Sequence, residues 1–199
     1  MLNRLQFVAC ATLIAATTLM LGAPAVAQTA PAQPPPAQPA PLREPDVIFV
    51  PTPPEVVEAM MKLAGVTSKD VVYDLGCGDG QIVTAAARDF GATAVGIDIN
   101  PVRVKEANER VNKAGVQGKV KILNEDLFTA NISQASVVTL YLLQTLNEKL
   151  IPKLNKELKP GTRIVSQTFT MGERYPPEKT VQAGYTSVYL WTVPMKEKK

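Results

Sequence analysis

Three aspartates in the middle of the chain have the spacing of residues that bind one ligand together. Asp74 ends an apolar run and is followed by residues 76–80, which read GCGDG. Asp98 ends the next apolar run, and Asp126 follows the one after that. Glycine permits positive φ and lets a ligand approach the backbone closely. A glycine loop with carboxylates at the ends of successive strands is typical of a nucleotide site at the edge of a parallel sheet.

The glycine spacing argues against a dinucleotide as the ligand. The dinucleotide fingerprint is G-x-G-x-x-G, whereas this loop reads G-x-G-x-G and Gln81 stands in the place of the last fingerprint glycine. The Asp74 carboxylate would repel a pyrophosphate but suits a cationic ligand. S-adenosylmethionine is such a ligand, because it carries an ammonium group and a sulfonium and no phosphate. The loop therefore predicts S-adenosylmethionine as the cofactor.

The two later aspartates fit the other parts of this cofactor. Asp98 lies 18 residues past Gly80, at the tip of the second strand, where a carboxylate can accept hydrogen bonds from both ribose hydroxyls. Asp126 is placed to bond the adenine amino group, with Ile99 and Leu127 on the two faces of the ring. The residues predicted to bind the cofactor are Asp74, Gly76, Cys77, Gly78, Gly80, Asp98, Ile99, Glu125, Asp126 and Leu127.

Alternating strands and helices must position these residues. Apolar runs predict strands at 71–75, 93–97, 120–123, 135–143, 163–169 and 185–193, and helical periodicity predicts helices at 52–64, 80–89, 100–115 and 146–158. Strands that alternate with helices of about 10 to 15 residues indicate right-handed crossovers and a parallel sheet covered on both faces. We therefore expect an α/β fold with a Rossmann-like, doubly wound sheet.

The first predicted helix carries its own start signal. Thr52 can cap this helix, Pro53 suits the first helical position, and Glu55 completes a capping box. Thr52 and the loop at 51–54 are also candidates to close over the cofactor and contact the substrate. Helix capping and cofactor closure are both left open.

The composition excludes several kinds of chemistry. The sequence has no histidine, so Ser-His-Asp and Cys-His machinery and histidine zinc sites are ruled out. Cys77 is the single cysteine outside the predicted leader, and we interpret it as a small side chain that the loop tolerates, not as a nucleophile or metal ligand. The net charge of +3 is too small to argue for a nucleic-acid partner.

The start of the chain differs in composition from the rest. Residues 1–27 read as a signal peptide, with Arg4 ahead of an apolar run and Ala-Val-Ala at 25–27. Residues 28–45 are rich in proline, alanine and glutamine and predict a disordered linker, which leaves 46–199 as the domain. We expect an exported protein, either periplasmic or tethered to the inner membrane by an uncleaved leader.

At the residues named above, the sequence resembles the class I S-adenosylmethionine-dependent methyltransferases. Within that class it is similar to the bacterial relatives of the mitochondrial lysine methyltransferase that modifies the c-ring protein of ATP synthase. Three stretches carry this closer likeness, namely residues 50–53 (VPTP), 74–80 (DLGCGDG) and 158–165 (LKPGTRIV). The resemblance implies a mostly parallel sheet with an antiparallel late strand. It also implies cofactor contacts at Asp74, Gly76, Gly78, Asp98 and Asp126.

The residues on the acceptor side are less specific. Tyr141, at the end of the fourth predicted strand, is the leading catalytic candidate, because its hydroxyl or ring could orient an amine; packing alone is the alternative. Residues 139–143 (TLYLL) lack the Asn-Pro-Pro-Tyr signature of many amino-group methyltransferases. The acceptor therefore stays open between a protein lysine, another amine and a small molecule.

Two functions other than methyl transfer are also compatible with the sequence. The first is an exported, non-catalytic nucleoside-binding or scaffold protein with the same fold. The predicted export favours it, since S-adenosylmethionine is made in the cytoplasm and an exported enzyme would need a supply. The second is a nicotinamide-dependent oxidoreductase, against which the glycine spacing argues.

Overall fold

The alternation of strands and helices predicted from the sequence is confirmed. The computed structural model describes residues 42–198, so the predicted leader and most of the predicted linker lie outside the described residues. The helices are α1 (Pro54–Ala64), α2 (Gln81–Phe90), α3 (Pro101–Lys113) and α4 (Gln144–Glu157). The strands are β1 (Val71–Leu75), β2 (Thr93–Asp98), β3 (Val120–Asn124), β4 (Val137–Leu140), β5 (Arg163–Gln167), β6 (Lys179–Ala183) and β7 (Thr186–Thr192). Within residues 42–198, no helix has the length and apolar character needed to cross a bilayer.

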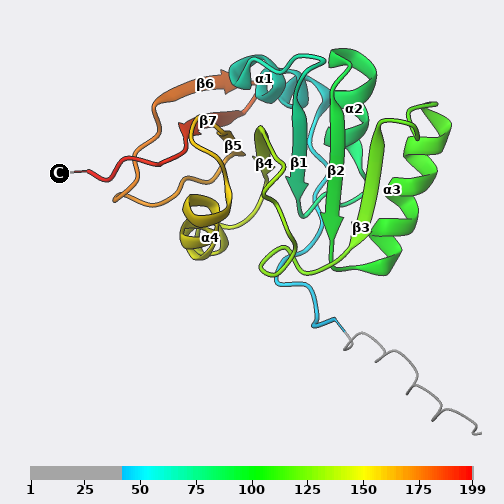
Figure 1. Ribbon diagram of the computed structural model, residues 1–199, viewed down its shortest axis with the longest axis horizontal. Coiled ribbons are helices and arrows are strands. Elements are labelled where there is room, and N and C mark those ends of the chain that lie inside the picture. The colour runs from blue at the N-terminus through cyan, green and yellow to red at the C-terminus, as the bar shows by residue number, and fades with distance from the viewer. Residues whose placement is uncertain (1–41, 199) are drawn as a thin grey trace, which may run out of the picture. The chain divides into compact units, whose positions relative to one another are not determined.

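The described strands form one sheet in the order β3-β2-β1-β4-β5-β7-β6 (Figure 1). Strands β1 to β5 pair in parallel, whereas β7 runs antiparallel to β5 and to β6. The sheet is thus the expected doubly wound, mostly parallel one with an antiparallel late strand. The chain switches direction across the sheet between β1 and β4, and sheets of this kind bind ligands at the carboxyl ends of the strands beside that point.

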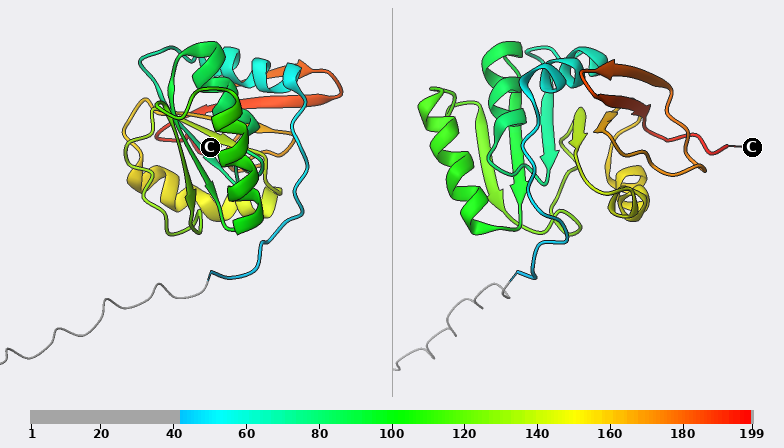
Figure 2. Two further views of the ribbon diagram at one scale, coloured as in Figure 1. Left: turned by 90° about the vertical axis from the view of Figure 1, so that its right-hand side faces the viewer. Right: turned by 180° about the vertical axis from the view of Figure 1, so that it is seen from behind.

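Helices cover both faces of the sheet (Figure 2). Helices α1, α2 and α3 lie on one face and α4 lies on the other. Successive side chains of a strand point to opposite faces, so Val72 of β1 packs with α1 and α2, while Leu75 packs with α4. Burial on both faces explains why the central strands read as almost unbroken apolar runs.

Strand β6 is missing from the sequence prediction, which had a single late strand. Of its five residues only Ala183 is buried, so the segment lacks the alternation of apolar and polar residues that marks a half-buried strand. Hydrogen bonding to β7, which is an effect of the tertiary structure, holds β6 in the sheet. The predicted strand at 135–143 is also too long, because β4 ends at Leu140 and α4 begins at Gln144.

The prediction that Thr52 caps the first helix is wrong. Pro53 is the N-cap of α1, and no side-chain hydrogen bond caps this helix. The hydroxyl of Thr52 instead donates to Oε1 of Gln167 at the end of β5, over 2.9 Å, and both residues are buried. A buried amide oxygen that lacked a donor would be costly, so Thr52 serves β5 rather than its own helix. The cap expected at Asn100 is confirmed, since its side chain accepts from the N–H of Val102.

Candidate active site

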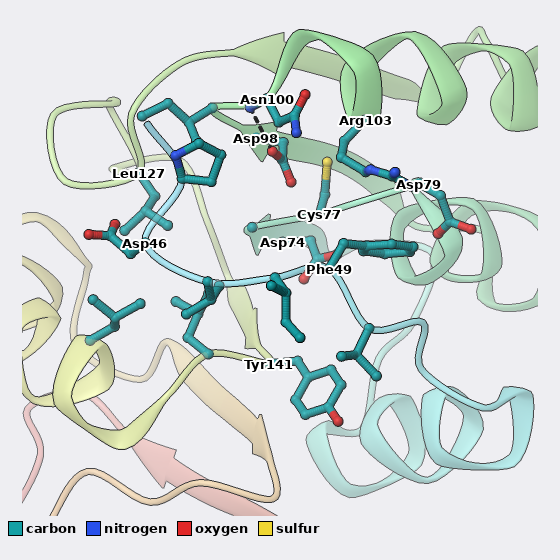
Figure 3. Close-up of a pocket in the computed structure, with 18 of the residues that line it drawn as sticks. Asp46, Phe49, Asp74, Cys77, Asp79, Asp98, Asn100, Arg103, Leu127 and Tyr141 are labelled. Carbon is teal, nitrogen blue, oxygen red and sulfur yellow. Dashed lines mark hydrogen bonds between the residues drawn. The ribbon is translucent and has the colours of Figure 1, made fainter. Parts of the chain in front are cut away.

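A pocket of about 320 Å³ lies at the carboxyl ends of β1, β2 and β4 (Figure 3). It is lined by nine of the residues predicted from the sequence: Thr52, Asp74, Gly76, Cys77, Asp98, Ile99, Asp126, Leu127 and Tyr141. Gly78, Gly80 and Glu125 were also predicted to be in the site but do not line the pocket. No group of acidic residues or cysteine suited to a metal ion is found among residues 42–198.

The glycine loop between β1 and α2 turns sharply because its three glycines all have positive φ, of 83°, 52° and 76°. The N–H groups of Gly76 and Cys77 both donate to the carbonyl oxygen of Ile97, which ties the start of the loop to β2. Gly80 has a packing role, because a Cβ there would lie 2.9 Å from the Cβ of Ala107 in α3. The loop backbone near Gly76 and Gly78 is therefore the part available to a ligand.

Asp98 holds the loop and the start of α3 in place. Its carboxylate accepts from the N–H of Gly78 over 2.8 Å and from the N–H of Asn100 over 2.9 Å. Burial raises the pKa of Asp98 above its usual value, against these hydrogen bonds, which favour the charged form. Glu125 supports the same strand end through its backbone, since its N–H donates to the carbonyl oxygen of Asp98.

Asp74 is a buried carboxyl group with a single donor. Its side chain accepts from the hydroxyl of Thr139 over 2.7 Å, and no cationic side chain among residues 42–198 pairs with it. Burial raises the pKa of Asp74 to about 7; the nearby carboxylates of Asp98 and Asp79 raise it further, and the Thr139 hydrogen bond opposes them. A positively charged ligand group beside Asp74 would favour its ionised form.

Cys77 fits the interpretation of a small, unreactive side chain. Its Sγ lies against β2, where a Cβ on Gly96 would come within 2.8 Å of the sulfur. Burial raises the pKa of the Cys77 thiol well above its usual value. Because the thiolate is the nucleophilic form, this cysteine has little reactivity.

Residues 42–50, which we call the strap, cross the mouth of the pocket (Figure 3). The strap was missed as part of the site by sequence reasoning, which treated 28–45 as linker. Nε of Arg43 lies 2.6 Å from Oδ2 of Asp126. The ring of Phe49 covers the glycine loop so closely that a Cβ on Gly78 would lie 2.3 Å from it, and the Arg103 guanidinium stacks 4.6 Å from the ring centre. The apolar run Val47–Val50 was the available signal.

Tyr141 presents its ring, not its hydroxyl, to the pocket. In Figure 3 the hydroxyl points toward α1 and away from Asp74 and Cys77. Leu127 and Ile99 line the opposite end of the pocket, near Asp126. The predicted acceptor and cofactor residues thus lie at two ends of one pocket.

This arrangement fits S-adenosylmethionine. Asp74 offers a buried negative group without a cationic partner, Asp98 a second carboxylate, and Gly76 and Gly78 an approachable backbone. The two pocket arginines are already paired, Arg43 with Asp126 and Arg103 with Glu106, and so are not free for a phosphate. The chemistry of this set favours a cationic nucleoside without phosphate.

Comparison with known proteins decides the family. Residues 74–178 match the family model described as ANTKMT methyltransferase domain. The chain belongs to this family of methyltransferases. The protein-lysine N-methyltransferase of Saccharolobus islandicus is 50% identical over 75% of this chain and 95% of its own length. The lysine N-methyltransferase of Mus musculus that is named for the C-type subunit of ATP synthase is 32% identical over 75% of this chain, which spans 60% of the length of that relative.

Solved methyltransferase structures agree on the cofactor. An RNA methyltransferase from Salinibacter ruber, in complex with S-adenosylhomocysteine, is 50% identical with a TM-score of 0.71, over 75% of this chain and 96% of that one. A methyltransferase from Thiobacillus denitrificans with the same ligand is 26% identical with a TM-score of 0.54, over 60% and 50% of the two chains. S-adenosylhomocysteine is the demethylated product of S-adenosylmethionine, which is the cofactor of this methyltransferase. The descriptions differ on the acceptor, protein lysine in one relative and RNA in another.

Proposed function

We propose that this enzyme methylates lysine side chains of a protein. The observation that carries the proposal is the 50% identity to a protein-lysine N-methyltransferase across 95% of that relative. The pocket supports a protein acceptor, because the arginines at its mouth are paired with carboxylates and leave little charge for a nucleic-acid backbone. An RNA acceptor is the second candidate, since a relative of equal identity is described as an RNA methyltransferase.

The three aspartates are proposed to divide the cofactor among them. Asp74 would hold the ammonium group of the methionine part, Asp98 the ribose hydroxyls and Asp126 the adenine amino group. Ile99 and Leu127 would flank the adenine ring, and Gly76 and Gly78 would allow the cofactor close to the backbone. When bound, S-adenosylmethionine supplies a methyl group that its sulfonium already activates.

The chain itself must align the acceptor and exclude water. Orienting two reactants can lower a barrier by about 7–11 kcal/mol, so a strong general base is not required. The ring of Tyr141 is proposed to orient the acceptor amine beside the methyl group, with Thr52 nearby in the same pocket. The amine must be neutral to attack, and its proton leaves to water.

Transfer of a labelled methyl group to a cell extract tests the acceptor. The extract is treated with ribonuclease or with protease after the reaction. We expect the label to survive ribonuclease, to be lost with protease and to be recovered as methyl-lysine after hydrolysis. Label lost with ribonuclease would reject protein methylation in favour of RNA. Donor binding without any label would favour a non-catalytic binding protein.

Export is proposed separately, on the basis of residues 1–27 alone. We propose that the protein is periplasmic or is tethered to the inner membrane by its leader. Sequencing of the mature amino terminus tests the cleavage: a start at Gln28 is expected for the cleaved form, and recovery of Met1 would indicate an uncleaved leader.

A further inference from the structure

We propose that Arg43 gates the cofactor pocket by occupying the carboxylate of Asp126, so that the cofactor and Arg43 compete for the same group. The inference rests on the proposed role of Asp126 in binding adenine. It adds that the strap must be released at Arg43 before the cofactor can be seated.

The contacts of Asp126 leave neither of its oxygens without a donor. Oδ2 accepts from Nε of Arg43 over 2.6 Å, and Oδ1 accepts from a terminal nitrogen of Arg43 over 3.2 Å. Oδ1 also accepts from the N–H of Phe128 over 2.9 Å. The Arg43 guanidinium additionally lies 5.4 Å from the centre of the Phe128 ring. An adenine amino group could bind this carboxylate only by displacing the guanidinium.

The two ends of the strap are held with different strength. Just beyond the strap, Thr52 is tied to Gln167 by a hydrogen bond between two buried, uncharged groups. At the other end, Arg43 is exposed, with 39% of its side chain accessible, and such ion pairs contribute little in water and weaken with salt. The strap therefore opens at Arg43 and hinges at Thr52.

Release of Arg43 does not strand its charge. Asp46, in the strap itself, lies 2.5 Å from Arg43 and can keep the guanidinium paired when Asp126 is taken. Ile48 and Val50 are largely exposed, so opening the strap uncovers little apolar surface besides Phe49. Phe49 must move as well, because its ring lies on Gly78, where the backbone would face the cofactor.

Binding of S-adenosylhomocysteine to the full-length protein, measured by calorimetry at several salt concentrations, tests this gate. This probe carries no net charge, so its own salt dependence is small. Arg43→Gln should bind it about fivefold more tightly than the wild type at low salt. The two affinities should converge as salt rises from about 0.02 M to about 0.5 M, because screening opens the wild-type ion pair.

Arg174→Gln is the matched control. Arg174 is also exposed, is paired with a carboxylate (Glu197) and stacks on an aromatic ring (Tyr175), but it lies outside the pocket. It should leave both the affinity and its salt dependence unchanged. Equal or weaker binding by Arg43→Gln at low salt would overturn the gate while leaving the proposed function intact. If neither protein binds the probe, the proposed function fails and the gate fails with it.

Discussion

At the residue scale, the buried Asp74 carboxyl group couples stability to pH. Its folded pKa of about 7 lies above the value of 3.8 for a free side chain. Between these two values the folded protein holds a proton that the unfolded chain releases. The contribution of Asp74 to stability is therefore fully present below about pH 4 and is lost as the pH rises through about 7. The unliganded enzyme tolerates this cost because the carboxylate is proposed to meet a cationic cofactor.

Asp74→Asn is expected to separate stability from binding. The variant keeps an acceptor for Thr139 but cannot ionise, so it should be more stable than the wild type at pH 8. The gap, at most about 4 kcal/mol, should narrow toward pH 4. Denaturant unfolding at both pH values measures it. Cofactor affinity should fall, and a variant that is less stable at pH 8 would contradict the burial argument.

At the element scale, the glycine loop depends on how α2 and α3 meet. Gly80 has a φ of +76° and sits against Ala107 of α3, whereas Gly115 has a φ of +69° with open space around it. Both positions therefore share the backbone strain that alanine would bring, and only Gly80 adds a clash between helices.

Gly80→Ala should lose more stability than Gly115→Ala, by about 1 kcal/mol or more. Chemical denaturation of the two variants measures the difference. Equal losses would mean that the contact between the loop and α3 relaxes freely and does not fix the position of the loop.

The bond between Thr52 and Gln167 joins the start of α1 to the end of β5. Thr52→Val keeps the shape of the side chain and leaves the buried Gln167 oxygen without a donor, for a loss of about 1–3 kcal/mol. A double-mutant cycle with Gln167→Met should give a clear coupling energy. Additive effects would refute the assignment and would return Thr52 to a local role at the helix.

At the scale of the whole molecule, the proposed cofactor contacts come from three neighbouring strands. Asp74 ends β1, Asp98 ends β2 and Asp126 follows β3, so one ligand would bridge half of the sheet. Ligand binding to the folded state alone must raise stability.

S-adenosylhomocysteine at about 100 times its dissociation constant should stabilise the protein by about 2.7 kcal/mol, seen as a higher melting temperature. Asp98→Ala should abolish the shift. Asp89→Ala, in an exposed ion pair outside the pocket, should retain it. A full shift in Asp98→Ala would remove that residue from the cofactor site.

The sequence by itself determined the local features of this protein. Apolar runs located β1 to β5 and β7 because their burial leaves a recognisable pattern, and the glycines at 76–80 indicated the loop. The ends of successive parallel strands meet at one edge, so Asp74, Asp98 and Asp126 could be grouped without coordinates.

Only the tertiary structure decided which distant polar groups pair. Arg43 reaches Asp126 across 83 residues and Thr52 reaches Gln167 across 115. Neither pairing leaves a periodic mark in the chain, and Arg43 stands in a segment whose composition is that of a linker. The exposed strand β6 is likewise held by its neighbour and not by its own pattern. Such contacts depend on the order of strands in the sheet, which brings remote segments together after local structure has formed.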